Sequence, residues 1–127
     1  MKLRVVVADD NPEFLDVVVS MLRIEFEVVA TAADGKAALK CICRHRPDVA
    51  VLDLTMPALN GLDVTKEVAK HSAGPAVVIC SVETDLEIVE AARAAGALGY
   101  VFKIRVTEDL KVAVKSVAGG QSFVSPG

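Results

Sequence analysis

Hydrophobic residues in this chain gather in short continuous runs, separated by longer segments with helical spacing. Apolar residues follow one another in these runs without alternating with polar ones, which is typical of strands buried on both faces of a parallel sheet. The run around Val28 is shorter than the others and is expected near a sheet edge. We predict strands at residues 4–8, 26–30, 49–52, 76–80 and 100–102.

The intervening segments predict five helices with recognisable boundary signals. Asn11 caps the first helix with Pro12 at its first position, and Asp34 opens the second helix, which ends before Pro47. A third helix is expected over residues 61–71. The remaining signals are a capping box at Thr84–Glu87, a stop at Gly96, a cap at Thr107 and a stop at Gly119-Gly120.

Alternating strands and helices predict an α/β fold, a doubly wound parallel sheet of five strands with five helices on both faces. The 127 residues allow one domain. We place it at residues 1–120. Residues 121–127 are short and polar, and are expected to be the start of a linker more than part of the fold.

Composition narrows the classes of function. A net charge of −3 argues against direct nucleic acid binding by this domain. No apolar stretch approaches the roughly 20 residues that a membrane span needs. Cys41, Cys43 and Cys80 lie inside apolar patterns, which favours reduced thiols and a cytoplasmic protein.

The sequence Cys41-x-Cys43-x-His45 invites a metal-binding interpretation, which we reject. Residues two apart on a helix point to nearly opposite sides, so the two thiols do not converge. We expect a buried Cys41 and a half-exposed Cys43, packed as small hydrophobic residues.

Four predicted strands run into polar residues. Taken singly, each has an ordinary explanation, as a helix cap, a loop residue or a solvated charge. In open parallel sheets, however, ligand sites lie just beyond the carboxyl ends of the strands, so these residues would meet at one edge. They are Asp9-Asp10, Asp53, Ser81 and Lys103.

These residues, in this order and at these strand ends, resemble the receiver domain of two-component response regulators (CheY-like) over nearly the whole chain. The resemblance implies a flavodoxin-like sheet of strand order 2-1-3-4-5 with the site between the first and third strands. The motifs that carry it are Asp9-Asp10, the stretch from Asp53 to Gly61, Ser81, and Gly99 to Lys103.

The resemblance also implies a chemistry. Asp53 would accept a phosphoryl group from a sensor histidine kinase or a phosphotransfer protein, and the domain would catalyse only its own phosphorylation and dephosphorylation. Mg²⁺, with Mn²⁺ as a substitute, would be bound directly by Asp10, Asp53 and the carbonyl of Thr55, and by Asp9 through water. Lys103 would pair with Asp53 and later with the phosphoryl oxygens. Carboxylates form acyl phosphates, and hard oxygen ligands suit Mg²⁺.

By the same resemblance, Ser81 and Tyr100 form a switch. Ser81 would donate a hydrogen bond to the phosphoryl group, and Tyr100 would then move inward and change the surface of the fourth helix, fifth strand and fifth helix. The phosphoryl group can shift the equilibrium between the resting and the switched conformation only by the difference in its interaction free energy with the two.

Four residues flank the site. Val82 and Ile104 depart from the family, which commonly has Ala and Pro there. Val82 is expected to slow phosphorylation by small donors, and the Lys103–Ile104 bond could be cis or trans. Thr55 and Glu83 occupy variable positions that influence acyl-phosphate lifetime in relatives.

The ending from Gly119 to Pro126 is similar to the stretch that joins receivers to a C-terminal helix-turn-helix domain. We therefore expect a transcriptional output through the protein's own DNA-binding domain, with phosphorylation-dependent homodimerisation as an option. A stand-alone receiver that acts through protein contacts is the alternative. A constitutive binding module, a flavodoxin-like cofactor binder and an aspartyl-phosphate phosphohydrolase rank lower; the last would need a second Asp where Thr55 stands.

Overall fold

The structure is a computed structural model that describes residues 2–71 and 73–126. Its centre is one parallel sheet of six strands in the order β2-β1-β3-β4-β5-β6. The first five follow the predicted order, and the sixth is an addition that the sequence did not predict. The strands are β1 (Arg4–Ala8), β2 (Glu27–Ala32), β3 (Val49–Asp53), β4 (Ala76–Ser81), β5 (Gly99–Phe102) and β6 (Phe123–Val124).

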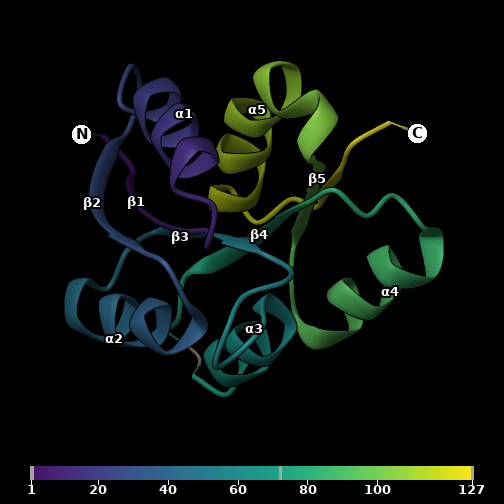
Figure 1. The fold of residues 1–127 in the computed structure, drawn as a ribbon, viewed down its shortest axis with the longest axis horizontal. Helices are drawn as coiled ribbons and strands as arrows, with labels where there is room; N and C mark the ends of the chain where they lie inside the picture. Colours follow the sequence, from purple (N-terminus) through teal and green to yellow (C-terminus); the bar gives the residue numbers. More distant parts are fainter. Residues whose placement is uncertain (1, 72, 127) are drawn as a thin grey trace.

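Helices cover both faces of the sheet, as expected for a doubly wound fold. In Figure 1, α1 and α5 lie side by side on one face, and α2, α3 and α4 cover the other. A single 3₁₀ turn, Lys103–Arg105, joins β5 to the last helix. The helices are α1 (Pro12–Leu22), α2 (Gly35–His45), α3 (Gly61–Ala69), α4 (Leu86–Ala95) and α5 (Val106–Ala118).

Two apolar clusters, one on each face, hold the layers together. Alternate residues of β1 divide between them, with Val6 in the cluster under α2, α3 and α4 and Val7 in the cluster under α1 and α5. All five residues of β3 are buried, which is why its sequence is an uninterrupted apolar run up to Asp53.

Most helix boundaries agree with the sequence signals. The side chain of Asn11 accepts hydrogen bonds from the N–H groups of Glu13 and Phe14, and Asp34 accepts one from Ala37. Gly96 ends α4 with φ 118°, a left-handed conformation that glycine adopts at little cost.

Two predicted caps were wrong. Asp85, one residue after Thr84, caps α4 by accepting the N–H of Glu87. Thr107 lies inside α5, because the preceding 3₁₀ turn lets the helix begin at Val106 without a side-chain cap. Two bounds also moved slightly, since β2 begins at Glu27 and α3 ends at Ala69.

The C-terminal residues are part of the fold, and in this respect our expectation of a linker was wrong for residues 123–125. Phe123 pairs with Gly99 and Val124 pairs with Tyr100 in parallel register. Ser125 is 3% exposed. Phe123 and Val124 each pack against one apolar cluster, which compensates for the shortness of β6. That a further domain follows stays a prediction.

Candidate functional site

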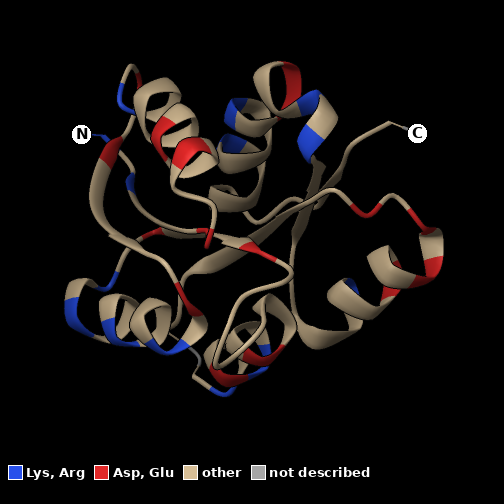
Figure 2. Cartoon of the chain, in the orientation of Figure 1, with Lys and Arg blue, Asp and Glu red and all other residues tan. Residues whose placement is uncertain are grey.

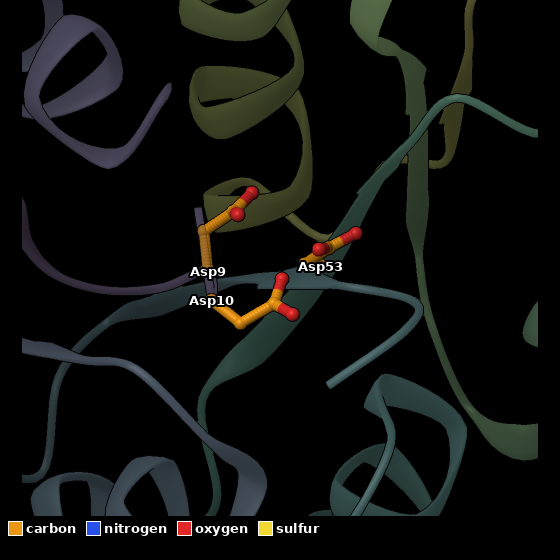
Figure 3. A group of neighbouring side chains, drawn as sticks. All are labelled: Asp9, Asp10 and Asp53. Carbon is orange, nitrogen blue, oxygen red and sulfur yellow. The ribbon is translucent and has the colours of Figure 1, made fainter. Parts of the chain in front are cut away.

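Three carboxylates converge at the carboxyl edge of the sheet. Asp9 and Asp10 directly follow β1, Asp53 ends β3, and these strands are neighbours, with Ala8 opposite Leu52. One carboxylate oxygen from each aspartate lies within 4.8 Å of the others. Figure 3 shows the three side chains gathered at this edge. The structure thus brings together the acidic group that the sequence predicted.

The three aspartates differ in environment. Asp9 and Asp53 are buried, whereas Asp10 is exposed. An oxygen of Asp9 accepts the backbone N–H of Asn11 at 2.8 Å, which fixes that carboxylate against the start of α1. A bound cation would therefore meet two enclosed carboxylates and one on the solvent side.

Lys103 reaches into this cluster from the end of β5. Its Nζ lies 2.9 Å from Oδ2 of Asp9 and 3.5 Å from Oδ2 of Asp53. We expected Asp53 as its partner, but the shorter ion pair is with Asp9. The same Nζ also lies 4.3 Å from the centre of the Phe14 ring, close enough for a cation–π contact.

Phe14 is a site residue that sequence reasoning missed. It follows Asp10 by four residues, and α1 begins at Pro12, so the first turn of the helix carries the ring back over the strand ends. That spacing was the available signal, but an aromatic residue at the start of an amphipathic helix is ordinarily assigned to the core.

Ser81 and Tyr100 are connected through Glu83. The Oγ of Ser81 accepts the N–H of Glu83 at 3.0 Å, and the hydroxyl of Tyr100 donates to the Glu83 carbonyl at 2.8 Å. Tyr100 is fully buried, and its ring meets that of Phe102 edge to face at 5.9 Å. Tyr100 therefore already occupies the inward position.

The flanking residues are mostly at the surface. Val82 is 72% exposed and Ile104 is 87% exposed, while Thr55 and Glu83 are also exposed. The described residues contain no cis peptide bond, so the Lys103–Ile104 bond is trans. The 3₁₀ turn accommodates this bond and still directs Lys103 toward the acidic cluster.

The electrostatics favour a cation at this edge. Burial and then the charge of Asp9 raise the pKa of Asp53 to about 6, although Lys103 lowers it. Burial disfavours the charged form of Lys103, but its bond to Asp9 and the charge of Asp53 outweigh this and raise its pKa. Figure 2 shows further acidic residues on the loop that enters α4.

The three cysteines differ in their distance from the site, and Cys80 lies opposite Asp53 in the pairing of β3 with β4. Cys80 is 2% exposed, and its burial raises the pKa of the thiol to about 12, which leaves it unreactive. On α2, Cys41 is half-buried, less enclosed than we expected, and Cys43 is exposed.

A family model described as "Response regulator receiver domain" matches residues 5–115. The chain belongs to this family. It is 33% identical to the transcriptional regulatory protein DegU of Brevibacillus brevis, in an alignment that covers 98% of this chain and 54% of that protein. It is 38% identical to the transcriptional regulatory protein NarL of Mycobacterium tuberculosis, over 98% of this chain and 59% of that protein.

Solved structures agree with this assignment. The signal receiver domain of the response regulator NarL from Mycobacterium tuberculosis superposes with a TM-score of 0.90 at 38% identity, covering 94% of this chain and 98% of that one. The chain spans little more than half the length of the curated relatives that it matches. This receiver is thus comparable with the signalling part of longer regulators.

Among the described residues, no helix is both long enough and apolar enough to cross a lipid bilayer.

Proposed function

We propose that Asp53 of this receiver domain accepts a phosphoryl group from the phosphohistidine of a sensor histidine kinase or a phosphotransfer protein. The observation that carries the proposal is the enclosure of Asp53 at the end of β3. Its carboxylate lies within 4.8 Å of oxygens from Asp9 and Asp10, and 3.5 Å from the ammonium of Lys103. The proposed nucleophile, two further carboxylates that could hold a cation with it, and the ammonium group of Lys103 therefore lie close together.

Receiver domains bind Mg²⁺ through acidic residues, and the donors here fit that ion. Three carboxylates offer the hard oxygens that Mg²⁺ prefers. We propose Asp10, Asp53 and the backbone carbonyl of Thr55 as direct ligands and Asp9 as a ligand through water, with Mn²⁺ as a substitute. When bound, the ion neutralises the negative charge that accumulates during phosphoryl transfer.

The residues of the chain divide the remaining work. An ionised oxygen of Asp53 attacks phosphorus, the P–N bond of the phosphohistidine breaks, and the leaving imidazole takes up a proton. The ammonium group of Lys103, which lies 2.9 Å from Oδ2 of Asp9, turns to the phosphoryl oxygens and pairs with them. No general base is needed because the nucleophile is already a carboxylate, so positioning and charge neutralisation supply most of the catalysis. The domain catalyses its own phosphorylation and, with water as acceptor, its dephosphorylation.

The signal passes from Ser81 to the adjoining loop. To donate to a phosphoryl oxygen, the Ser81 hydroxyl would move toward Asp53 and draw with it the N–H of Glu83 that it now accepts. Tyr100 is bonded to the Glu83 carbonyl and already lies inward, so we propose that the segment from Ser81 to Thr84 moves and that Tyr100 guides it. The surface formed by α4, β5 and α5 would change as a result.

Incubation with ³²P-labelled acetyl phosphate and Mg²⁺ tests the acceptor. The wild-type protein and Asp16→Asn, which changes an exposed carboxylate of α1, are expected to take up one acid-stable, hydroxylamine-sensitive label. Asp53→Asn is expected to take up none. Label that persists in Asp53→Asn, or an unlabelled wild type, would refute the assignment. Many turnovers of a phosphomonoester would instead indicate a phosphohydrolase.

We also propose that this receiver regulates transcription through a C-terminal DNA-binding domain. The DegU and NarL relatives are transcriptional regulatory proteins, and both are longer than this chain, which supports the proposal. Reading the gene beyond codon 127 tests it, because an in-frame helix-turn-helix domain is expected there. A stop codon at that point would favour a stand-alone receiver acting through protein contacts.

A further inference from the structure

The segment that follows α5 returns to the sheet and binds along β5. In Figure 1 this yellow C-terminal segment runs beside β5. The N–H of Phe123 donates to the Leu98 carbonyl at 3.1 Å, and the N–H of Ser125 donates to the Tyr100 carbonyl at 2.9 Å. The tail is therefore hydrogen-bonded to β5, the strand that ends at Phe102, directly before Lys103.

Ser125 makes the most unusual contact of the tail. Its side-chain Oγ accepts the backbone N–H of Phe102 at 3.1 Å, so a serine replaces the backbone carbonyl that a longer strand would supply. Phe102 immediately precedes Lys103. The Ser125 hydroxyl thus holds the Val101–Phe102 peptide, one residue before the site lysine.

The other end of the 3₁₀ turn is held by a separate contact, between Arg105 and Asp109. Nε of Arg105 lies 2.8 Å from Oδ2 of Asp109, and its Nη2 lies 3.3 Å from Oδ1, a two-pronged ion pair. Asp109 is buried, and its hydrogen-bonded ion pair with Arg105 lowers the pKa of its carboxyl. Arg105, Asp109 and Ser125, here called the clasp, therefore hold the turn on both sides of Lys103.

We propose that Ser125 is a positioning residue for Lys103, and that the clasp couples the phosphorylation site to the chain beyond α5. This inference rests on the proposed function of Asp53. Lysine is a flexible four-carbon side chain, so the placement of its ammonium group depends on how firmly its backbone is held. Displacements near 1 Å are enough to weaken contacts at a reacting centre.

Coupling between two sites is reciprocal. If the docked tail helps Lys103 to contact a phosphoryl group, then a phosphoryl group that engages Lys103 must hold the tail more firmly by the same factor. The direction of any segment that follows Pro126 would then depend on the state of Asp53. The tail would act as a tether that is firmly anchored in one state and looser in the other.

Binding of beryllofluoride, a phosphomimetic, tests the positioning role. In NMR titrations with Mg²⁺, Ser125→Ala is expected to bind beryllofluoride three- to tenfold more weakly than wild type, with an affinity for Mg²⁺ alone within twofold. Ser122→Ala, an exposed serine of the same tail, should behave as wild type. In a Lys103→Met background, Ser125→Ala should cause no further loss. Equal beryllofluoride affinity in the two serine variants, a parallel loss for Mg²⁺, or additive losses would overturn the proposal.

Two further measurements test the positioning role. The first needs no phosphoryl group or phosphomimetic, and the second uses a variant other than Ser125→Ala. Because Nζ of Lys103 lies 4.3 Å from the centre of the Phe14 ring, the ring is expected to shift the ε-methylene resonance of Lys103. In Ser125→Ala this resonance should move toward the value of an exposed lysine even in buffer alone. Asp109→Asn should reproduce the effect by weakening the clasp from α5. An unchanged Lys103 resonance in both variants would refute the positioning role even if the wild type failed to bind beryllofluoride.

Amide exchange tests the reciprocity. Beryllofluoride with Mg²⁺ is expected to slow exchange of the Ser125 amide at least threefold in wild type and to leave it unchanged in Lys103→Met. An equal rate with and without beryllofluoride in wild type would show that the tail does not sense the site. A wild type that takes no label at Asp53 would refute the proposed function, whereas labelling without any effect of Ser125→Ala would refute only the inference.

Discussion

The ammonium group of Lys103 lies closer to Asp9 than to the proposed acceptor, with 2.9 Å between Nζ and Oδ2 of Asp9. Asp9 therefore holds the cation that the phosphoryl group will need, and it also places a second negative charge beside Asp53. In the proposed transfer, Lys103 would have to leave Asp9 for the phosphoryl oxygens. Its ammonium group is already inside the acidic cluster but is paired with Asp9.

Removal of the Asp9 charge should lower the pKa of Asp53. Asp9 raises that pKa, and without it Lys103 is free to pair with Asp53 alone. In Asp9→Asn, the Asp53 carboxyl is therefore expected to titrate below the value of about 6 that holds in wild type. A ¹³C NMR titration in EDTA measures this. Asp16→Asn serves as the control, and an Asp53 pKa that stays the same in Asp9→Asn would contradict the expected effect of Asp9.

The acidic cluster should cost stability when no metal is added. The pKa of Asp53 rises from 3.8 to about 6 on folding, so between these values the folded protein binds more protons than the unfolded chain, and stability falls as the pH rises. Well above pH 6 the ionised carboxylate costs about 3 kcal/mol. Asp53→Asn in EDTA should therefore be more stable than wild type at pH 7.5 by about that amount, with the difference vanishing near pH 4.

Urea unfolding at both pH values checks this prediction. Mg²⁺ should then stabilise the wild type and not Asp53→Asn, because a ligand stabilises only the state that binds it. A loss of stability in Asp53→Asn at pH 7.5 would mean that the carboxylate is better compensated in the fold than its neighbours indicate.

Val82 should limit access to the site without contributing to the fold. It follows Ser81 and is 72% exposed, so truncation should change the free energy of unfolding by less than about 0.5 kcal/mol. We expect Val82→Ala to be phosphorylated by acetyl phosphate roughly two- to fivefold faster, which corresponds to about 0.5–1 kcal/mol of barrier. Stopped time courses of labelling measure the rate. Identical labelling rates in Val82→Ala and wild type would show that Val82 does not restrict access of acetyl phosphate to the site.

Tyr100→Phe should loosen the loop after β4 and leave the acceptor intact. It removes one buried hydrogen bond, to the Glu83 carbonyl, while the ring remains in place. We expect a loss of about 1 kcal/mol of stability, faster amide exchange at Glu83, and normal labelling of Asp53. Exchange at Glu83 that matches wild type would indicate that Tyr100 does not guide this segment.

The fold and the site were predictable from sequence to different degrees. Strands buried on both faces, such as Val49–Asp53, leave an uninterrupted apolar run, and Asp53 stood out because a charge at the end of such a run needs partners. The general location of the site followed from the rule that ligands bind at the carboxyl ends of parallel strands.

The finer geometry depended on contacts that sequence spacing does not encode. Whether Lys103 prefers Asp9 or Asp53 is decided by distances of a few tenths of an ångström. The predicted start of α5 at Thr107 was wrong because a 3₁₀ turn precedes the helix, which begins at Val106 without a side-chain cap. The sixth strand was missed because two half-buried residues, Phe123 and Val124, are too short a run to predict a strand without the neighbour that they pair with.

The short sixth strand also has a consequence for how this protein should be handled. β5 is wholly buried, and without β6 its apolar outer edge would present unpaired N–H and C=O groups to solvent. Such an edge is a template for pairing between molecules and hence for aggregation. A fragment cut at residue 120, the boundary that composition favours, would expose that template, and a soluble fragment should retain the residues through Pro126.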